Sequence, residues 1–362
     1  MIHSAIPSRR QFLASALGAG IALGQEPRVQ DGQDATFTSD VNVVNLFAGV
    51  HKKSGEIVSN LTKDDFTLAE DSRPQAIKYF SRESGLPLTL GLLVDTSMSQ
   101  RNLINEERTA SYRFFDKVLR VDRDLAFLIH FDFDTELLQD LTSNKRSLER
   151  GLEQLELPMR QLRQSQQGGA RSGRGGQYPT PGGGRQGGGT VLYDAILLAS
   201  DEVTRKQKGR KALILLTDGD DTGSKVSLGS SIEAAQRADT LVYSILFEDK
   251  QSAFQMQMPG GMGGGGRRRG GGAPPPMVSN RPDGKKILQR ISRETGGGFF
   301  EVSKKHPIDE IYARIQEELR NQYSIGYVSD RKADPGIFRK ISLTARQKDM
   351  IVQTREGYYP EN

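Results

Sequence analysis

The sequence predicts an α/β protein with a Rossmann-like, doubly wound and mostly parallel sheet, together with a smaller all-β domain formed by the N- and C-terminal flanks. Residues 86–322 alternate short apolar runs with amphipathic stretches, the pattern of a parallel sheet covered by helices. The flanks, 36–85 and 323–360, contain short alternating runs without a helical period. Because neither flank is long enough to bury a core alone, we expect the two to pair.

The flanking segments are predicted as strands. An alternating run at 41–50 opens the N-terminal flank, and a second at 77–80 follows after turn-forming stretches. Similar runs stand at 323–328 and 337–344 in the C-terminal flank. Alternation with a period of two is typical of a strand with one buried face. These runs are therefore expected to share one β domain.

The middle region is predicted to fold as a single domain of alternating strands and helices. Apolar strands are expected at 88–94, 125–131, 212–216, 241–247 and 298–302. Amphipathic helices are expected at 104–119, 145–155, 191–206, 232–238, 285–293 and 307–320. Pro307 suits a first helical position, and acidic side chains follow it in the first turn.

Two glycine-rich insertions, at 160–189 and 253–282, interrupt this domain and are interpreted as solvated loops. The formal net charge of the chain is +5. Residues 159–189 and 253–283 carry nine arginines against one aspartate, which leaves the rest of the chain at −3. A basic folded surface is therefore not supported, and we expect no nucleic-acid partner.

The first 24 residues are predicted to be an export signal. Arg9 and Arg10 precede a glycine- and alanine-rich apolar run to Leu23, which resembles a bacterial twin-arginine signal. The run is too short to span a bilayer as a permanent helix, although a retained N-terminal anchor is the alternative to cleavage. We expect a periplasmic or extracellular protein without a transmembrane helix after signal cleavage.

Several classes of chemistry are absent from the sequence. The chain has no cysteine, which excludes disulfides, thiolate metal sites and cysteine catalysis. Its four histidines belong to no paired motif, and neither a Gly-x-Ser-x-Gly elbow nor a phosphate-binding loop is present. These absences favour a protein that is not an enzyme.

Carboxylates and hydroxyls follow two of the predicted strands. Asp95, Ser97 and Ser99 come directly after one buried strand, and Asp218 comes after another. Ligands of open α/β sheets bind outside the carboxyl ends of the strands, where these side chains are expected to meet. Hard oxygen donors of this kind suit Mg²⁺, Mn²⁺ or Ca²⁺.

This pattern resembles the metal-ion-dependent adhesion site of von Willebrand factor A domains: Asp-x-Ser-x-Ser, a later threonine that opens a helix, and a strand that ends in Thr-Asp-Gly. The resemblance implies metal ligands at the matching positions, which are Asp95, Ser97, Ser99, Thr190 and Asp218. It also implies a divalent cation, first of all Mg²⁺, with one coordination position that an Asp or Glu carboxylate of a protein partner fills. The expected function is thus metal-dependent protein binding or adhesion.

The layout of the chain resembles the von Willebrand A-related proteins of acidobacteria. The segment at 61–66 and the closing segment at 355–359 contribute to this resemblance, which covers most of residues 36–360. One departure is that the first insertion runs directly into Thr190.

Other interpretations remain open from the sequence. Asp95 could simply cap the next helix. A metal-dependent hydrolase or phosphatase would use Asp95 as nucleophile and Asp218 as second carboxylate. A metal-independent envelope scaffold is the third possibility. Four further acids near the strand ends are interpreted as solvated turn residues: Asp132, Asp134, Asp220 and Asp221.

Overall fold

The computed structural model describes residues 43–82, 85–100, 103–155, 190–247 and 283–360. The predicted export signal and both glycine-rich insertions lie outside these residues. All of the described residues belong to one compact unit. Among the described residues, no helix is both long and apolar enough to cross a membrane.

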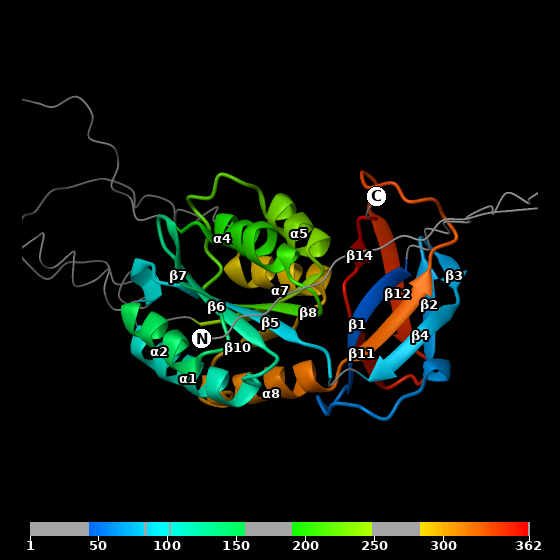
Figure 1. Ribbon diagram of the computed structural model, residues 1–362, viewed down its shortest axis with the longest axis horizontal. Coiled ribbons are helices and arrows are strands. Elements are labelled where there is room, and N and C mark those ends of the chain that lie inside the picture. Colours follow the sequence, from blue (N-terminus) through cyan, green and yellow to red (C-terminus); the bar gives the residue numbers. More distant parts are fainter. Residues whose placement is uncertain (1–42, 83–84, 101–102, 156–189, 248–282, 361–362) are drawn as a thin grey trace, which may run out of the picture. The chain divides into compact units, whose positions relative to one another are not determined.

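A six-stranded sheet forms the centre of the middle region, with the strand order β10-β9-β8-β5-β6-β7 (Figure 1). Five strands are parallel, and β7 pairs antiparallel with β6 at one edge. The strands are β5 (Leu88–Asp95), β6 (Leu125–Phe131), β7 (Thr135–Thr142), β8 (Arg210–Thr217), β9 (Thr240–Leu246) and β10 (Phe299–Glu301). The predicted α/β class with a mostly parallel sheet is confirmed.

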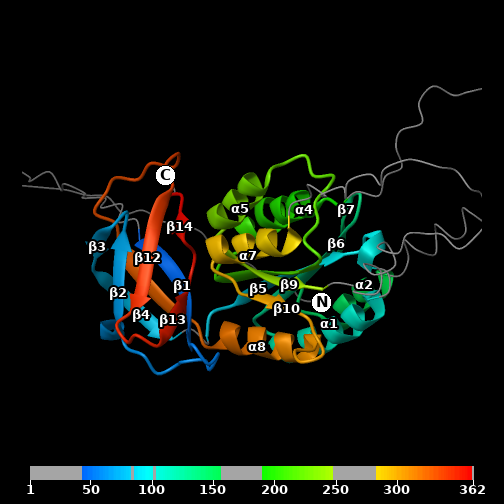
Figure 2. The same cartoon turned by 180° about the vertical axis from the view of Figure 1, so that it is seen from behind.

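Helices cover both faces of this sheet, as Figures 1 and 2 show. They are α1 (Ile104–Val118), α2 (Lys145–Gln154), α4 (Leu192–Leu198), α5 (Leu228–Arg237), α7 (Gly284–Thr295) and α8 (Ile308–Arg320). Alternate residues of β5 face opposite layers: Leu92 packs in the core with α1, α2 and α8, and Leu93 packs in the core with α4, α5 and α7. Every residue of β5 is buried, because the strand has a helix layer on each side.

The helix expected at 191–206 is helical throughout but not uniform. After α4 the chain makes a π-turn at Ala199–Val203 and then a 3₁₀ turn at Thr204–Lys206. A further 3₁₀ turn, η2 (Met98–Gln100), lies between β5 and α1. Pro307 is the residue before α8 and has extended backbone angles, so it caps the helix instead of occupying its first turn.

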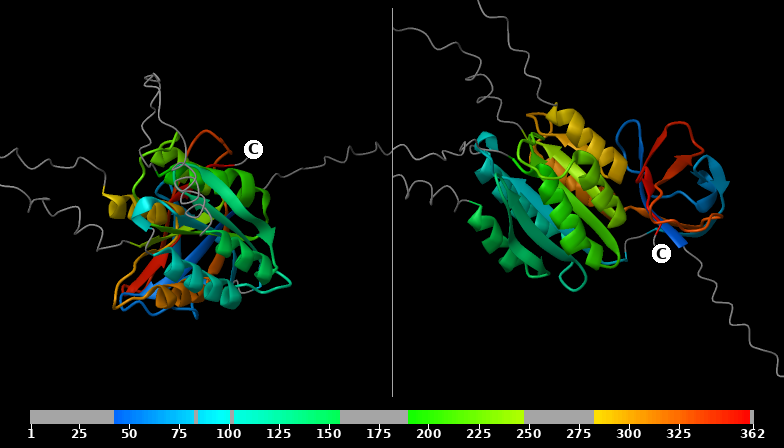
Figure 3. Two further views of the ribbon diagram at one scale, coloured as in Figure 1. Left: turned by 90° about the vertical axis from the view of Figure 1, so that its left-hand side faces the viewer. Right: turned by 90° about the horizontal axis from the view of Figure 1, so that it is seen from above.

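The two flanks form a pair of four-stranded antiparallel sheets, seen beside the α/β part in Figure 3. One has the order β13-β1-β11-β4 and the other β14-β12-β2-β3, so each combines strands from both flanks. The N-terminal strands and turn are β1 (Val43–Lys52), η1 (Lys63–Asp65), β2 (Phe66–Glu70), β3 (Arg73–Gln75) and β4 (Ile77–Arg82). The C-terminal strands are β11 (Tyr323–Val328), β12 (Arg339–Ala345), β13 (Met350–Gln353) and β14 (Gly357–Tyr358). The predicted all-β part built from both flanks is confirmed.

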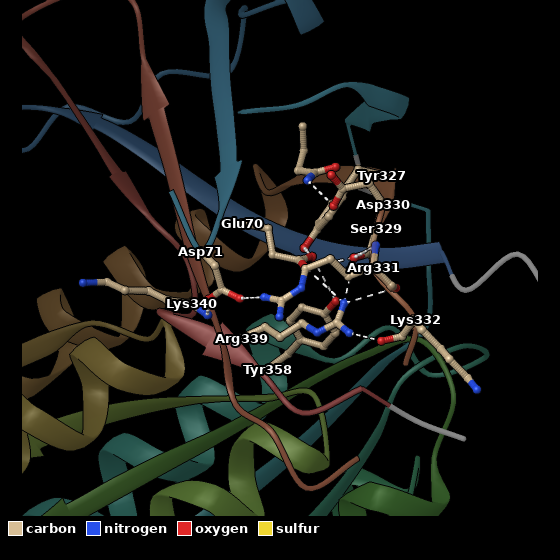
Figure 4. A network of polar contacts seen from close by, with 11 residues as sticks. Glu70, Asp71, Tyr327, Ser329, Asp330, Arg331, Lys332, Arg339, Lys340 and Tyr358 are labelled. Carbon is tan, nitrogen blue, oxygen red and sulfur yellow. Dashed lines mark hydrogen bonds and ion pairs between the residues drawn. The ribbon is translucent and has the colours of Figure 1, made fainter. Parts of the chain in front are cut away.

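A buried polar cluster joins the two flanks (Figure 4). Glu70 of β2 is fully buried, and its Oε1 accepts hydrogen bonds from Arg339 Nη1 at 3.0 Å and Ser329 Oγ at 2.8 Å. Its Oε2 accepts from the hydroxyls of Tyr327 at 2.6 Å and Tyr358 at 3.1 Å. Four groups of the C-terminal flank thus satisfy one carboxylate of the N-terminal flank.

Candidate metal centre

The first loop of the candidate site begins at the carboxyl end of β5. Asp95 is fully buried and anchors the loop through both carboxylate oxygens. Its Oδ1 accepts a hydrogen bond from the backbone N–H of Ser97 at 2.9 Å. Its Oδ2 accepts one from the Thr217 hydroxyl, at the end of β8, at 2.6 Å. Asp95 therefore connects the first loop directly to the strand that leads into the third.

The third loop brings Asp218 to the same place. The Ser99 hydroxyl donates to Asp218 Oδ2 at 2.6 Å, and the hydroxyls of Ser97 and Ser99 are 3.0 Å apart. The adjacency of β5 and β8 explains this proximity, because parallel neighbouring strands end at one sheet edge. The structure thus brings together four of the five residues expected to be ligands: Asp95, Ser97, Ser99 and Asp218.

Gly219 fixes the direction in which the third loop leaves Asp218. Its φ of +82° lies in the left-handed region that favours glycine. A Cβ atom at this position would lie 2.5 Å from the backbone oxygen of Gly284, at the start of α7. The Thr-Asp-Gly sequence therefore needs its glycine both for backbone conformation and for contact with α7.

Thr190, the fifth predicted ligand, is held by its main chain. Its backbone N–H donates to the Thr222 hydroxyl at 3.1 Å, and its carbonyl accepts from the N–H groups of Thr222 and Gly223, both at 3.0 Å. The next residue, Val191, donates its N–H to the Asp132 carbonyl at 2.9 Å. The second loop thus adjoins the third, but these contacts do not join the Thr190 hydroxyl to the other four residues.

Two acids that the sequence patterns did not single out as ligands or anchors fasten the second loop to the third. Asp221 Oδ1 accepts from the Ser224 hydroxyl at 2.5 Å and from the backbone N–H of Tyr193 at 3.3 Å. Asp194 accepts the backbone N–H groups of Lys225 and Val226. Asp221 is half-buried, so it is an anchor between loops, whereas the sequence suggested a solvated turn residue. No short motif marks such long-range anchors in a sequence.

Two other turn acids, Asp132 and Asp134, bond locally. Asp132 Oδ1 accepts the backbone N–H of Asp134 at 3.1 Å, and Asp134 Oδ1 accepts that of Thr135 at 2.8 Å. These are the bonds of a tight turn between β6 and β7.

The electrostatics of the site favour a cation. Burial, and then the nearby Asp218 carboxylate, raise the pKa of Asp95 to about 7, although hydrogen bonds from Ser97 and Thr217 oppose the rise. Two carboxylates held this close repel each other, and a dication between them would relieve the repulsion. Carboxylate and hydroxyl oxygens are also the donors that hard divalent cations prefer. The residues present therefore fit a Mg²⁺-type ion.

A carboxylate-rich or histidine-rich centre is not present in the described part of the chain. No cluster of three or more His, Cys, Asp or Glu side chains there is arranged to hold a metal ion. A site at this sheet edge would therefore depend on its hydroxyl donors as much as on its two acids.

Comparison with models of known protein families and with curated protein sequences gives no match for this chain. Among solved structures, the chain is distantly similar to von Willebrand factor A domains and related proteins. An aerotolerance-related membrane protein from Bacteroides fragilis is 16% identical with a TM-score of 0.39, over 65% of this chain and 98% of that one. BatB from Bacteroides thetaiotaomicron is 19% identical with a TM-score of 0.36, over 65% of this chain and 100% of that one.

A third similar structure is proximal thread matrix protein 1 from the mussel byssus, in a form whose metal-ion-dependent adhesion site holds zinc. It is 15% identical with a TM-score of 0.41, over 70% of this chain and 50% of that one. At these identities the likeness concerns the fold alone.

Proposed function

We propose that this chain is a metal-dependent protein-binding module. The observation that carries the proposal is the convergence of two separate sequence motifs on one sheet edge, where Ser99 donates to Asp218 at 2.6 Å and Asp95 is bound to Thr217 at 2.6 Å. A helix-capping role for Asp95 does not require a second acidic loop beside it. A cation site explains why both loops bring oxygen donors to the same point.

The proposed ligands are the two carboxylates and the three hydroxyls of Asp95, Ser97, Ser99, Thr190 and Asp218. Two carboxylates only balance the charge of a dication and leave no excess negative charge at the site. A metal held by this set can therefore still bind an anion. We propose Mg²⁺ as the resident ion, with Mn²⁺ or Ca²⁺ as substitutes, and a protein Asp or Glu carboxylate as the group that is bound. The resemblance to metal-ion-dependent adhesion sites supports the same assignment.

We place this function outside the cytoplasm, on the basis of the twin-arginine pattern at Arg9 and Arg10. We also propose membership of the von Willebrand A-related proteins of acidobacteria, on the layout of the chain. The all-β part built from the flanks would then carry the binding domain.

A hydrolase that uses Asp95 as nucleophile fits the geometry less well. Asp95 is fully buried, and each of its carboxylate oxygens already accepts a hydrogen bond. A nucleophile must reach the substrate, and a fully buried carboxylate presents no accessible oxygen to one. A cleft of about 510 Å³ is lined by residues of α7, β12 and β13 and contains none of the five proposed ligands.

Partner capture tests the proposal. The immobilised protein is exposed to envelope extract in Mg²⁺, in EDTA, and in Mg²⁺ after the carboxylates of the extract have been amidated. We expect retained proteins only in Mg²⁺ with the untreated extract, and loss of retention in Asp218→Ala. Asp134→Ala is the matched control, because Asp134 is an exposed acid in the neighbouring turn. Retention that survives EDTA and amidation would contradict the proposal.

A further inference from the structure

Two buried polar side chains follow the first loop of the candidate site. Gln100 ends the 3₁₀ turn η2, and its backbone N–H donates to the Ser97 carbonyl at 3.0 Å. Glu107 lies in the first turn of α1, and its N–H donates to the Leu103 carbonyl at 3.0 Å. Both residues are 0% exposed. The chain thus places an amide and a carboxyl inside the protein within eight residues of Ser99.

Neither side chain has a hydrogen-bond partner within the described protein. This holds for both amide atoms of Gln100 and for both carboxyl oxygens of Glu107. Burial of an unpaired polar group is costly, and most costly for a carboxylate. Glu70, equally buried, shows the usual solution, with four donors around one carboxylate. The packing of the protein therefore does not explain why the Glu107 carboxyl is buried without a partner.

Glu107 lies in the first turn of α1, the helix that follows the first loop of the candidate metal centre, and so stands at the end of α1 next to that loop. Burial raises the pKa of Glu107 well above its usual value, and the charges of Asp95, Glu106 and Asp218, in that order, raise it further. One turn further along the same helix face, the Ser111 hydroxyl is paired with the Tyr312 hydroxyl at 2.9 Å. On this helix face, the Ser111 hydroxyl has a hydrogen-bond partner, whereas the Glu107 carboxyl, which is nearer to the first loop, has none.

We propose that Glu107 and Gln100 form an inner wall of the metal site, where Glu107 accepts a hydrogen bond from water bound to the cation and Gln100 accepts or donates one. This inference rests on the proposed function. Both are positioning residues, since they act on the metal through its hydration shell and not as ligands. Outer-shell partners of this kind orient what the metal holds, and their loss typically lowers metal affinity about 10- to 100-fold.

If Glu107 supports the metal in this way, its replacement by an apolar residue should lower metal affinity but raise the stability of the metal-free protein. Glu107→Leu removes both acceptors, so metal affinity should fall about tenfold or more. The same change removes a buried unpaired carboxyl, so the metal-free protein should unfold at a higher temperature than wild type. Glu107→Gln keeps an oxygen acceptor, and its affinity should stay within about threefold of wild type. A residue that only filled space would lower stability and affinity together when replaced.

The experiment combines calorimetric titration of Mg²⁺ with thermal unfolding in EDTA, on the full chain. The variants are Glu107→Leu, Glu107→Gln and Gln100→Met, with Glu106→Gln as the matched control because Glu106 is the exposed neighbour on the same helix. We expect weaker binding with higher metal-free stability in Glu107→Leu and Gln100→Met, and no change in Glu106→Gln.

Two results would contradict the role of the inner wall but leave the metal site intact. One is that Glu107→Leu binds Mg²⁺ as wild type does although Asp95→Ala has lost binding. The other is that Glu107→Leu loses both metal affinity and metal-free stability. If wild type binds no Mg²⁺ at all, the proposed function fails and the inner wall fails with it.

Discussion

Replacing Glu70 by alanine should destabilise the part of the protein that the two flanks build. The Glu70 and Arg339 side chains are 0% and 4% exposed and lie 3.0 Å apart, so the change leaves a guanidinium buried without its carboxylate. Two tyrosine hydroxyls, from Tyr327 and Tyr358, lose their acceptor as well. Removal of one partner of a buried ion pair costs about 3–5 kcal/mol, and we expect a loss in this range.

Urea unfolding followed by far-UV circular dichroism measures this loss, because the chain contains no tryptophan. For an m value of about 2 kcal/mol per M, the midpoint should fall by roughly 2 M. Glu56→Ala is the control: its ion pair with Lys52 has side chains that are 63% and 47% exposed, and such pairs contribute less than about 1 kcal/mol. Replacing Glu70 and Arg339 together by Met should recover much of the stability. A midpoint for Glu70→Ala equal to that of Glu56→Ala would show that the buried pair stabilises the protein no more than an exposed one.

Three further predictions concern pH, backbone conformation and export. Burial raises the pKa of Glu318 to about 7 from 4.5, so the unfolded chain loses this proton first and stability falls by up to about 3 kcal/mol as pH rises from about 4.5 to 7. Glu318→Gln should flatten this slope, and an unchanged slope would contradict the assignment. Gly219→Ala should lower the melting temperature and weaken metal binding, because its Cβ would lie 2.5 Å from a backbone oxygen of α7. Gly229→Ala is the control, since the nearest atom there is 3.7 Å away, and equal behaviour of the two variants would refute the requirement for glycine. Changing Arg9 and Arg10 together to Lys should retain the protein in the cytoplasm on cell fractionation, and normal export would contradict the signal.

The parts of the fold that the sequence predicts are those with an uninterrupted apolar pattern. β5 is buried over its whole length, and its run of leucine and valine is evident in the sequence. β7 is half exposed and its burial does not alternate regularly, so its sequence lacks the period of two that predicts a strand. β2 and β3 are short strands whose place depends on pairing with β12 and with each other, which is set by tertiary contacts.

The candidate site, too, has features that the sequence predicts and features that depend on tertiary contacts. The position of Asp95 and Asp218 after two apolar strands predicts that they share an edge, since parallel strands end together. The sequence does not say that β5 and β8 are neighbours, and this adjacency puts the two acids in contact. Glu107 looks like part of a solvated acidic pair with Glu106. Its position three residues after Ile104 and three before Ala110 places it on the buried face, a helical signal that could have revealed it.

The metal site is tested most sharply by calorimetric titration of Mg²⁺ and Mn²⁺ into wild type and into Asp95→Ala, Asp218→Ala and Thr190→Ala. Each aspartate supplies half of the fixed negative charge, so either replacement should lower metal affinity at least tenfold, or by about 1.4 kcal/mol. Thr190→Ala should have a milder effect, because water can replace a neutral hydroxyl. Asp134→Ala should bind as wild type does, since its carboxylate belongs to the turn.

The pH dependence of the same titration gives an internal check. Because burial and Asp218 raise the pKa of Asp95 to about 7, a proton competes with the metal below that pH, and wild-type affinity should fall about tenfold per pH unit. A metal site at this sheet edge predicts binding in wild type, loss of binding in both aspartate variants, and weaker binding at acid pH. Absence of binding in wild type, or equal affinity in Asp95→Ala, would contradict the metal site and the function proposed from it.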